Sequence, residues 1–442
     1  MLLYILPNQL FEIKHIPKGI SEIILWEHPS FFTKYNFNKK KLILHRASMQ
    51  CYYNELMKSL KNVECRYVNF NEKHKKIDNA YYFDPINDIE DFPKNKYMME
   101  SPNFFLTKDD YENIYNNKKS KSISFTRYFY PRCKSIVQFL VNTDSKDSSN
   151  RKPYSKTLHF NKLPKLNDED IILRKAIKYV NIHFHTNVGN LENFNYPISR
   201  HQAKKFLNHF IKRNLFHFGN FQDAFNTDHD NMYHSILSSS LNIGLLNPTD
   251  IVSALRRVDR KEIPMNSLEG YFRQLCWREF QRYCYIYYKT LTTKSYFKLK
   301  KRMGKEWYSG TTNILPVDMC IKKAFDTGYL HHIERLMIMG NAMLLNGIQP
   351  NDGHRWFMEF AIDSYEWVML QNVYDMVFFC GGGLTSYKPY ITSSNYILKM
   401  SNYSNDKNDW VSNWNSKYES FLETNLDKLY KYRYHFPTLR KK

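Results

Sequence analysis

The stretch YSGTTNILPVDMCIKKAFDTGYLHHIERLMIMGNAMLL, residues 308–345, decides how this sequence is interpreted. Its apolar residues recur at helical spacing between His331 and Leu345. His331 and Arg335 are four residues apart and share one helical face, while His332 points about a quarter-turn away. A helical metal pair needs i and i+4 spacing, so we predict no metal site here. The two histidines are either structural, or they act as acids or hydrogen-bond donors in a pocket.

Helical periodicity also governs the chain on both sides of this stretch. It predicts helices over Arg200–Arg213, Leu268–Lys289 and Trp356–Leu370, with a last helix over Asn413–Tyr432. Pro248 and Pro350 lie where helices begin or end. From about residue 199 onward the chain is therefore expected to be mainly α-helical.

The first third of the chain has a different pattern. Four short apolar runs read as buried strands, and a helical pattern over Ala47–Leu60 lies between two of them; the runs are Leu2–Leu6, Ile23–Trp26, Leu42–Leu44 and Cys65–Val68. Strand, helix and strand in this order predict a parallel, doubly wound sheet. Residues 144–165 are polar and predict a loop. We therefore expect an α/β domain over 1–125, a linker region over 126–198 and a helical domain over 199–442.

Composition narrows the class of protein. Lys plus Arg number 64 against 43 Asp plus Glu, a formal charge of +21, which ranks a nucleic acid first among partners. An A+T-rich coding sequence would also explain much of the lysine excess. No apolar run approaches the roughly 20 residues of a membrane span, so we expect no membrane partner. The seven cysteines form no C-x-x-C pair, which indicates a reducing compartment without a disulfide framework.

A serine-rich segment precedes the apolar run that ends at Pro248. It reads YHSILSSSLNIGLLNP over residues 233–248 and includes Ser235 and Ser238. Hydroxyls and backbone N–H groups at a helix start can cradle a phosphate, and the same residues can simply cap a helix. Spacing alone leaves both interpretations open.

A second segment combines aromatic residues with arginines. It reads EGYFRQLCWREFQRYCYIYY over residues 269–288 and carries Arg273, Trp277 and Arg278. Arginines between aromatics suit stacking on bases and pairing with phosphates, so these three residues are candidate DNA contacts. A core helix with arginines reaching to its surface is the alternative.

Taken together and in order, these segments resemble the photolyase and cryptochrome family. HHIERL is followed by GN, HRW, AIDSYEWV, KPY and SSNYILKMS, and the pattern is most similar to the iron–sulfur bacterial branch, the prokaryotic (6-4) photolyases. HSILS, LNIGLL, FRQLCWREF and the N-terminal LPNQL extend the resemblance over nearly the whole chain. It implies an α/β antenna-type domain followed by an all-α domain that binds FAD.

The resemblance also implies roles for individual residues. Ser235, Ser238 and Asn242 would contact the FAD phosphates, Asp363 and Asn372 the ribityl or isoalloxazine portion, and Asn395 and Tyr396 the pocket wall. The catalytic set would comprise a histidine pair with Arg335 on the lesion side, and an electron route to the flavin, namely His331, His332, Arg335, Trp356, Tyr390 and Tyr308. Tyr308, beside Trp307, stands where the branch carries tryptophan. Because tyrosine is hard to oxidise unless its proton leaves, we expect slower photoreduction.

The chain departs from this branch where the branch holds an iron–sulfur cluster. The four cysteine positions read Pro316, Ser404, Lys407 and Ser412, and none of these residues supplies a thiolate. We therefore predict no iron–sulfur cluster, with aromatic packing, for example by Trp410 and Trp414, in its place. In the N-terminal domain, the resemblance makes Glu27 the residue to watch for an antenna chromophore of lumazine or folate type; the departures within LPNQL leave its identity open.

The function implied by the resemblance is light-dependent repair of UV-induced pyrimidine dimers in DNA by an electron from reduced FAD. The histidine pair favours the (6-4) product slightly over the cyclobutane dimer. The alternatives are a cryptochrome-like blue-light photoreceptor without repair activity, and a flavin-free nucleic-acid-binding module. We expect a soluble monomer that acts inside the cell wherever its DNA lies, in a nucleoid, a nucleus or a virus particle.

Overall fold

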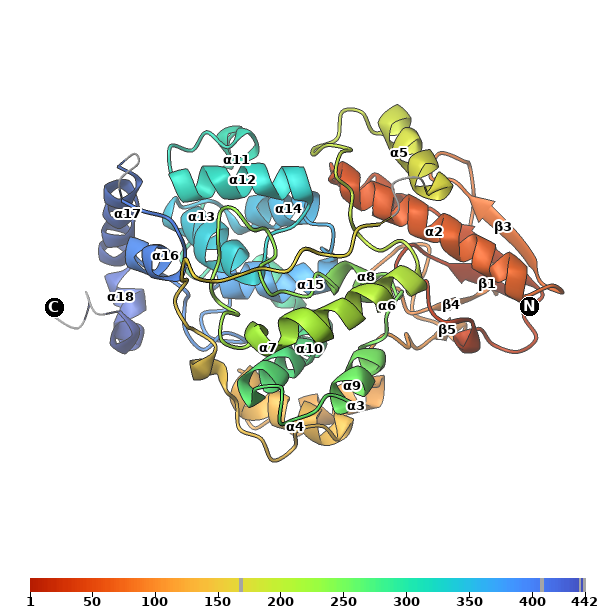
Figure 1. Cartoon of the computed structure of the whole chain (residues 1–442), viewed down its shortest axis with the longest axis horizontal. Coiled ribbons are helices and arrows are strands. Elements are labelled where there is room, and N and C mark those ends of the chain that lie inside the picture. Colours follow the sequence, from red (N-terminus) through yellow and green to blue (C-terminus); the bar gives the residue numbers. More distant parts are fainter. Residues whose placement is uncertain (167–169, 406–408, 437–438, 440–442) are drawn as a thin grey trace.

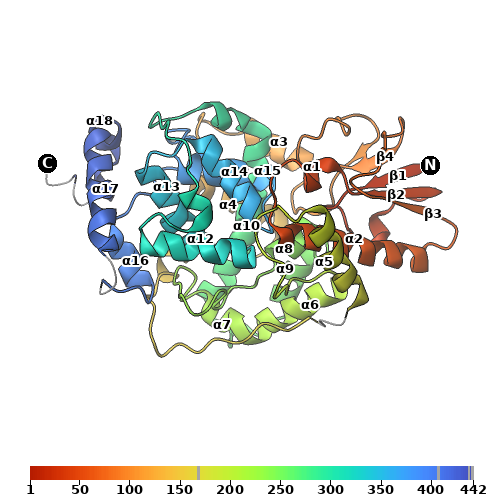
Figure 2. The ribbon, with the colours of Figure 1, turned by 90° about the horizontal axis from the view of Figure 1, so that it is seen from above.

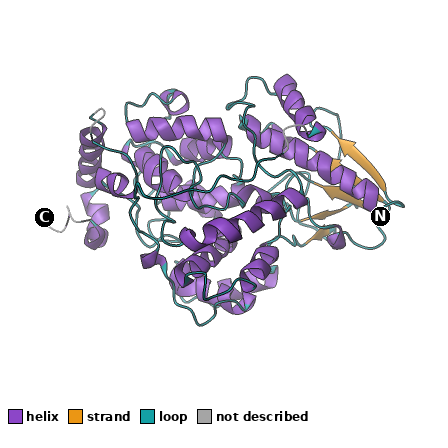
Figure 3. Ribbon diagram, in the orientation of Figure 1, coloured by secondary structure: helices purple, strands orange, loops and turns teal. Residues whose placement is uncertain are grey.

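A five-stranded sheet occupies one end of the molecule (Figures 1 and 3). The computed structural model describes residues 1–166, 170–405, 409–436 and 439. The strand order is β3-β2-β1-β4-β5, and every pair is parallel; the strands are β1 (Leu2–Ile5), β2 (Glu22–Trp26), β3 (Glu64–Val68), β4 (Tyr81–Phe83) and β5 (Met98–Met99). Crossovers on either side of β1 make the sheet doubly wound, as predicted.

One long helix, α2 (Lys39–Ser59), follows β2 and covers the sheet. It begins eight residues earlier than the predicted helix and absorbs Leu42–Leu44, so the prediction of a strand there was wrong. All six residues from Lys40 to His45 are buried. A helix turn that is buried all round carries no 3.6-residue stripe, and a short apolar run within it is indistinguishable from a buried strand.

The remainder of the chain is helical, in an α/β plus all-α architecture (Figures 1 and 2). The helices that precede residue 199 are α1 (Pro29–Phe32), α3 (Lys108–Asn116), α4 (Tyr130–Val137) and α5 (Ile171–His183). Those that follow are α6 (Arg200–His209), α7 (Leu215–Phe218), α8 (Ser238–Asn242), α9 (Pro248–Arg256), α10 (Met265–Tyr287), α11 (Glu306–Ser309), α12 (Leu315–Thr327), α13 (Asn341–Leu345), α14 (Pro350–Phe360), α15 (Glu366–Met369), α16 (Ser394–Met400), α17 (Trp410–Thr424) and α18 (Leu426–Leu429). Pro248 and Pro350 are the first residues of α9 and α14, as predicted. No helix in the described ranges is both long and apolar enough to cross a bilayer.

The predicted helix over Trp356–Leu370 is interrupted. It ends with α14 at Phe360 and resumes with α15 at Glu366, which leaves residues 361–365 as a short buried turn. The Ser364 hydroxyl bonds back to the carbonyls of Met358 and Ala361, at 3.0 and 2.9 Å. Serine side chains that bond to nearby backbone in this way compete with helical hydrogen bonds. The interruption leaves Asp363 within this buried turn.

Candidate functional site

Asp363 is the hub of a polar cluster inside the helical domain. Ser238 of α8 donates to its Oδ2 at 2.6 Å, and the Asn242 amide donates to its backbone oxygen at 2.8 Å. Arg335 completes the cluster with a two-pronged ion pair, at 2.9 Å to Oδ1 and 3.2 Å to Oδ2. The structure thus brings together four of the residues that the sequence singled out, from three separate segments.

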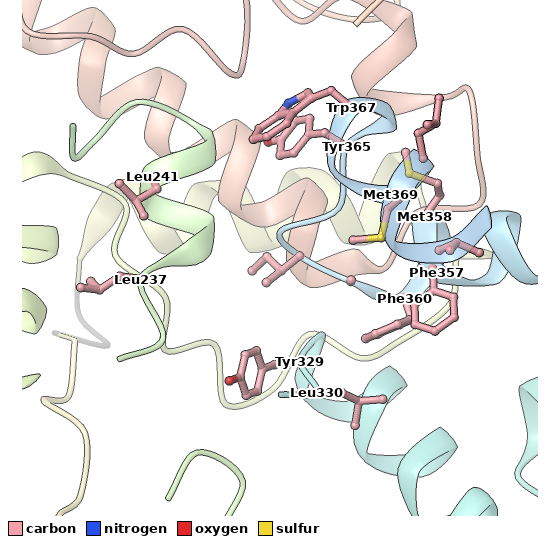
Figure 4. Packing of buried hydrophobic residues seen from close by; sticks show 14 of the residues in the cluster. Leu237, Leu241, Tyr329, Leu330, Phe357, Met358, Phe360, Tyr365, Trp367 and Met369 are labelled. Carbon is pink, nitrogen blue, oxygen red and sulfur yellow. The ribbon is translucent and has the colours of Figure 1, made fainter. Parts of the chain in front are cut away.

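The electrostatics of Asp363 follow from these contacts. Burial alone would raise the pKa of the Asp363 carboxyl, but the Arg335 guanidinium and the Ser238 hydroxyl together hold the pKa below its usual value. Arg335 is therefore paired with a carboxylate at neutral pH. Apolar side chains surround the turn (Figure 4), and they include Leu237, Leu241, Tyr329, Leu330, Phe360 and Trp367. A fixed buried ion pair of this kind can orient a polar ligand.

The α/β domain holds the turn from the other side. Lys41 of α2 donates to the Ser364 backbone oxygen and lies 3.3 Å from its hydroxyl. His45, one helical turn further on, lies 2.9 Å from the Tyr365 hydroxyl. Burial lowers the pKa of Lys41 to about 7, although the charges of Asp363 and Glu366 oppose the shift. The position of Asp363 therefore depends on a helix from the other domain.

Three histidines gather next to this cluster. The His234 and His331 rings are stacked, with centroids 4.7 Å apart and an interplanar angle of 12°, and both rings are buried. The His332 ring meets that of His234 edge-on at 5.6 Å, and its side chain is 41% exposed. Arg335 lies four residues after His331, so one helical turn carries both the histidine pair and the partner of Asp363. Sequence reasoning missed His234, which only the fold brings to this position.

Hydrogen bonds indicate the protonation of the two buried rings. His331 Nδ1 accepts from the Ile333 backbone N–H at 3.2 Å, so a neutral ring carries its proton on Nε2. Burial lowers the pKa of His331 well below its usual value, and the neighbouring histidines add to the shift. Burial likewise lowers the pKa of His234 to about 3. His331 thus presents a neutral Nε2–H donor, which has no hydrogen-bond partner among the described residues and lies 3.9 Å from the Glu334 carboxylate.

The three histidines could also be read as a metal centre, because each offers a ring nitrogen and these nitrogens lie within 4.8 Å of one another. Both nitrogens of His234, however, face backbone carbonyls, of Asn231 at 3.2 Å and of Gln222 at 3.1 Å. The Nε2 of neutral His331 carries a proton and has no lone pair for a metal. These contacts favour a hydrogen-bonded histidine cluster over a metal site.

Acidic and basic groups border the exposed side of His332. Its Nε2 lies 3.4 Å from Asp223, whose other oxygen lies 3.5 Å from the Arg151 guanidinium. The charges of Asp223 and Arg151 also affect two tyrosines, Tyr390 and Tyr396. Burial raises the pKa of Tyr390 to about 12 and raises that of Tyr396 as well; Asp223 raises both pKa values further, and Arg151 opposes. The charges of Asp223 and Arg151 therefore act on both tyrosines.

Two residues of the predicted electron route, Trp356 and Tyr308, contact the same phenylalanine. The Trp356 indole donates to the Trp307 backbone oxygen at 2.8 Å, and the Phe325 ring lies between Trp356 and Tyr308, with centroids 5.8 and 5.7 Å from theirs. Tyr390 has the neighbours described above instead. Its role in the route stays a prediction.

The Tyr308 hydroxyl has a partner that the sequence did not suggest. It donates to the Glu359 carboxylate at 2.6 Å. Burial raises the pKa of Glu359, which is 6% exposed, against the effects of the Tyr308 hydrogen bond and the Arg355 charge. Burial and the Glu359 carboxylate also raise the pKa of Tyr308. A proton acceptor is thus in place for this tyrosine.

The arginines of α10 are structural in this conformation. Arg273, 4% exposed, pairs with Asp147 and Glu269 at 3.0 and 3.2 Å. Arg278, 9% exposed, donates to Asn242 and to the Asn103 backbone oxygen, at 3.1 and 2.7 Å. Trp277 stacks on Phe125, with centroids 3.7 Å apart. The burial and internal pairing of Arg273 and Arg278 favour the core alternative in this conformation, and the predicted contact of these three residues with DNA stays a prediction.

The other residues predicted to contact the cofactor do not bond to Asp363. Ser235 accepts from the Tyr271 hydroxyl at 3.0 Å, and Asn372 accepts from Gln281 of α10 at 3.2 Å. Asn395 is exposed on α16. Within the described ranges, the side-chain partners of Asp363 are thus limited to Ser238, Asn242 and Arg335.

Several buried polar atoms of the helical domain have no partner in the part of the chain that the structure describes. They include the hydroxyls of Ser239 and Ser240, both side-chain amide atoms of Asn341 and of Gln371, and Nη2 of Arg278. Buried groups of this kind are normally paired, so a set of them indicates water or a polar ligand. Hydroxyl, amide and guanidinium groups match a ligand that carries phosphate, hydroxyl and heterocyclic groups.

Comparison with known proteins identifies the family. Residues 3–84 and 82–196 match the family model for deoxyribodipyrimidine photo-lyase-related proteins. A (6-4) photolyase of Agrobacterium fabrum is 33% identical over 344 residues, which are 74% of this chain and 67% of the relative. The chain belongs to the photolyase/cryptochrome family. An uncharacterized protein of Acanthamoeba polyphaga mimivirus is 54% identical over 92 residues, 21% of this chain and 74% of the viral protein.

Solved structures agree on the photolyase fold. A bacterial class III photolyase from Agrobacterium tumefaciens superposes with a TM-score of 0.53 over 97% of this chain and 91% of its own, at 14% identity. An archaeal photolyase from Sulfolobus tokodaii gives 0.57 over 96% and 99%, at 12% identity. The α/β plus helical architecture predicted from the sequence is therefore confirmed.

Glu27 does not offer a free carboxylate to an antenna chromophore in this photolyase-family chain. The side chain is fully buried at the end of β2 and accepts from Tyr67 at 2.7 Å, Arg46 at 2.8 Å and the Phe70 backbone at 3.2 Å. Tyr179, from α5, donates to it at 2.8 Å. The groups around Glu27 do not fit a second chromophore bound to it, because its oxygens are already occupied.

The region that replaces the branch's cluster cysteines is held by two tryptophans. The Trp410 indole donates to the Ser404 backbone oxygen at 3.2 Å, and the Trp414 indole donates to that of Thr392 at 2.9 Å; both side chains are 1% exposed. Lys407, one of the four substituted positions, lies outside the described residues. The absence of an iron–sulfur cluster stays a prediction from the missing thiolates.

Proposed function

We propose that this protein is a light-dependent DNA photolyase that repairs UV-induced pyrimidine dimers, with the (6-4) product as the preferred lesion. The observation that carries the proposal is the coupling of two clusters by one helical turn. His331 and His332 form a donor and acid cluster, while Arg335 on the same turn orients Asp363. Repair of a (6-4) product needs both an electron and a proton. A cofactor site beside a cluster of histidines meets this requirement.

FAD is the cofactor that the residues fit. Arg335, Asp363 and Ser238 would hold its polar portion, and the unpartnered hydroxyls and amides described above would meet its phosphates and ring. When bound and reduced, FAD supplies the electron on absorbing light. The archaeal structure named above holds two FAD molecules, which supports a flavin in this fold. The protein itself would bind and orient FAD and exclude water from the site.

The histidines supply what a (6-4) lesion needs beyond an electron. The neutral Nε2–H of His331 can donate a hydrogen bond to a lesion oxygen or nitrogen. His332 is partly exposed and lies beside the Asp223 carboxylate, which suits it to pass a proton between the lesion and solvent. The relative at 33% identity is itself a (6-4) photolyase, which supports this lesion over the cyclobutane dimer.

Light-dependent repair of two defined oligonucleotides tests the proposal. One carries a single cyclobutane dimer and the other a single (6-4) product, each assayed in light and in darkness with the flavin-loaded protein. We expect repair of the (6-4) oligonucleotide in light only, and its loss in His331→Ala and His332→Ala. His201→Ala, which removes an exposed histidine from α6, is the matched control.

The other outcomes discriminate between the alternatives. Repair of the cyclobutane dimer that is indifferent to the histidines would overturn the lesion assignment. A protein that binds FAD and repairs neither oligonucleotide would be a cryptochrome-like photoreceptor. A protein without blue-light absorption after reconstitution with FAD would be a flavin-free nucleic-acid-binding module.

A further inference from the structure

The polar linker forms one wall of an open cleft on the helical domain. The cleft has a volume of about 590 Å³ and is lined by Ser148, Ser149, Arg151, Lys152, Pro153, Asn220, Met265 and Asn266. In Figure 1 the chain that follows these linker residues crosses the helical domain before it reaches α5. The sequence marked this segment only as a loop, and the repair chemistry proposed above makes no use of it.

Hydrogen bonds join the walls of this linker cleft. The Lys152 backbone N–H donates to the Asn220 carbonyl at 3.0 Å. The Asn266 amide, from the start of α10, donates to the Asn220 side chain at 3.0 Å and to the Ser149 carbonyl at 3.3 Å. These hydrogen bonds therefore hold the linker in a fixed position against the start of α10.

The lining has the chemistry of a site for a chain of phosphates. It combines two exposed cations, Arg151 and Lys152, with the hydroxyls of Ser148 and Ser149, and none of its residues is acidic. Met265 and Asn266 are the first residues of the 23-residue helix α10, whose start has no side-chain cap. The positive end of a helix adds to the attraction that the two cations exert on an anion.

The cleft is connected to the histidine cluster. Arg151 pairs with Asp147 and lies 3.5 Å from Asp223, and Asp223 lies 3.4 Å from His332. The Arg151 side chain is 55% exposed, so it can exchange these carboxylates for a phosphate. A DNA strand whose backbone lies in the cleft would thus have its neighbouring nucleotide beside His332.

We infer that the linker cleft binds the phosphate backbone of the DNA strand next to the lesion. This inference rests on the proposed function for the identity of the anion. It assigns the DNA contacts to Arg151, Lys152 and the linker serines, in place of the buried arginines of α10. Phosphate contacts fix the position of a strand without reading its sequence.

Salt-dependent binding of an undamaged duplex in darkness tests the inference, because it needs neither flavin nor repair. Each lost phosphate contact lowers the slope of log K against log salt by about 0.9. We expect this loss in Lys152→Gln and in Arg151→Gln, with weaker binding that is equal for damaged and undamaged DNA. Lys156→Gln removes an exposed charge from the same linker outside the cleft, and should keep the wild-type slope.

The remaining outcomes are equally definite. Arg151→Lys keeps the charge and should keep the slope, which separates a phosphate contact from a role of Arg151 in folding. Slopes in Lys152→Gln and Arg151→Gln that equal those of Lys156→Gln would overturn the inference even if the protein repairs DNA. A reduced slope in a protein without repair activity would uphold the cleft and reject the proposed function instead.

Discussion

The contact between Tyr308 and Glu359 predicts a proton-coupled step in the photoreduction of the bound flavin. An oxidised tyrosine releases its phenolic proton, and the Glu359 carboxylate is 2.6 Å from the hydroxyl. In the predicted route, Trp356 would first give an electron to a bound, photoexcited FAD; Tyr308 would then reduce the Trp356 radical cation as its phenolic proton moves to Glu359, which would leave a neutral tyrosyl radical and a neutral carboxylic acid. We therefore expect photoreduction in Glu359→Gln to be slower, because an amide cannot take the proton.

The magnitude follows from the strength of the contact. A hydrogen bond to a charged group contributes about 1.5–3 kcal/mol. If the whole of that contribution is expressed in the barrier, at about 1.4 kcal/mol for each tenfold change, the rate in Glu359→Gln falls about 10- to 100-fold. The assay is the loss of oxidised-flavin absorbance under steady blue light with an external reductant, in H₂O and in D₂O.

A double-mutant cycle provides the control. Tyr308→Trp replaces the phenol with an indole, which can be oxidised while it keeps its proton. The Glu359→Gln substitution should therefore have little effect on the rate in the Tyr308→Trp background, and the D₂O effect should disappear. An equal slowing by Glu359→Gln in both backgrounds would refute the reasoning, and would leave Glu359 as a packing residue only.

Three further predictions concern stability, and urea unfolding checks each of them. Arg335→Met leaves the Asp363 carboxylate buried without its partner and should cost about 3–5 kcal/mol, while Arg335→Lys should cost less because the charge remains. Because the folded pKa of Asp363 is lowered, its contribution is full above its unfolded pKa, near 3.9, and is lost as the pH falls through the folded value. The acid-induced loss of stability should therefore be smaller in Asp363→Asn, and identical curves would contradict this. Tyr179→Phe removes a hydrogen bond to the Glu27 carboxylate and should cost about 1.5–3 kcal/mol, whereas the control Tyr53→Phe removes one to the neutral Cys65 carbonyl at 3.2 Å and should cost about 0.5–1.5 kcal/mol. Equal losses in the two tyrosine variants would show that the charge of Glu27 does not matter.

The fold could be predicted from the sequence where local pattern and final environment agree. The runs at β1 and β2 are apolar and lie in the middle of the sheet, and the prolines at the starts of α9 and α14 act within one turn. The prediction failed at Leu42–Leu44 and at residues 361–365. In the first case, burial on all sides removes the helical stripe. In the second, a single serine side chain competes with the helix, and its effect depends on packing that the sequence does not display.

The candidate site was predictable as a set of residues but not as a set of contacts. The resemblance to a known family picked out four residues from distant segments, namely Ser238, Asn242, Arg335 and Asp363. The interacting groups of Arg273, Arg278 and Trp277, by contrast, look available in a sequence because their partners, such as Asp147 and Asn103, come from remote segments. His234 and Glu359 were missed for the same reason. Each acts through a neighbour that only the tertiary structure supplies.

The contacts of α2 with the turn over residues 361–365 have a consequence for how this protein can be divided. Lys41 and His45 belong to the α/β domain, yet they bond to Ser364 and Tyr365, the two residues that directly follow Asp363. The Glu27 carboxylate of the α/β domain is already occupied by groups of the protein. Its α2 also supports the turn that carries Asp363, so a helical domain made alone would lose the contacts of Lys41 and His45 with that turn. The α/β domain therefore contributes side chains that fix the turn next to Asp363.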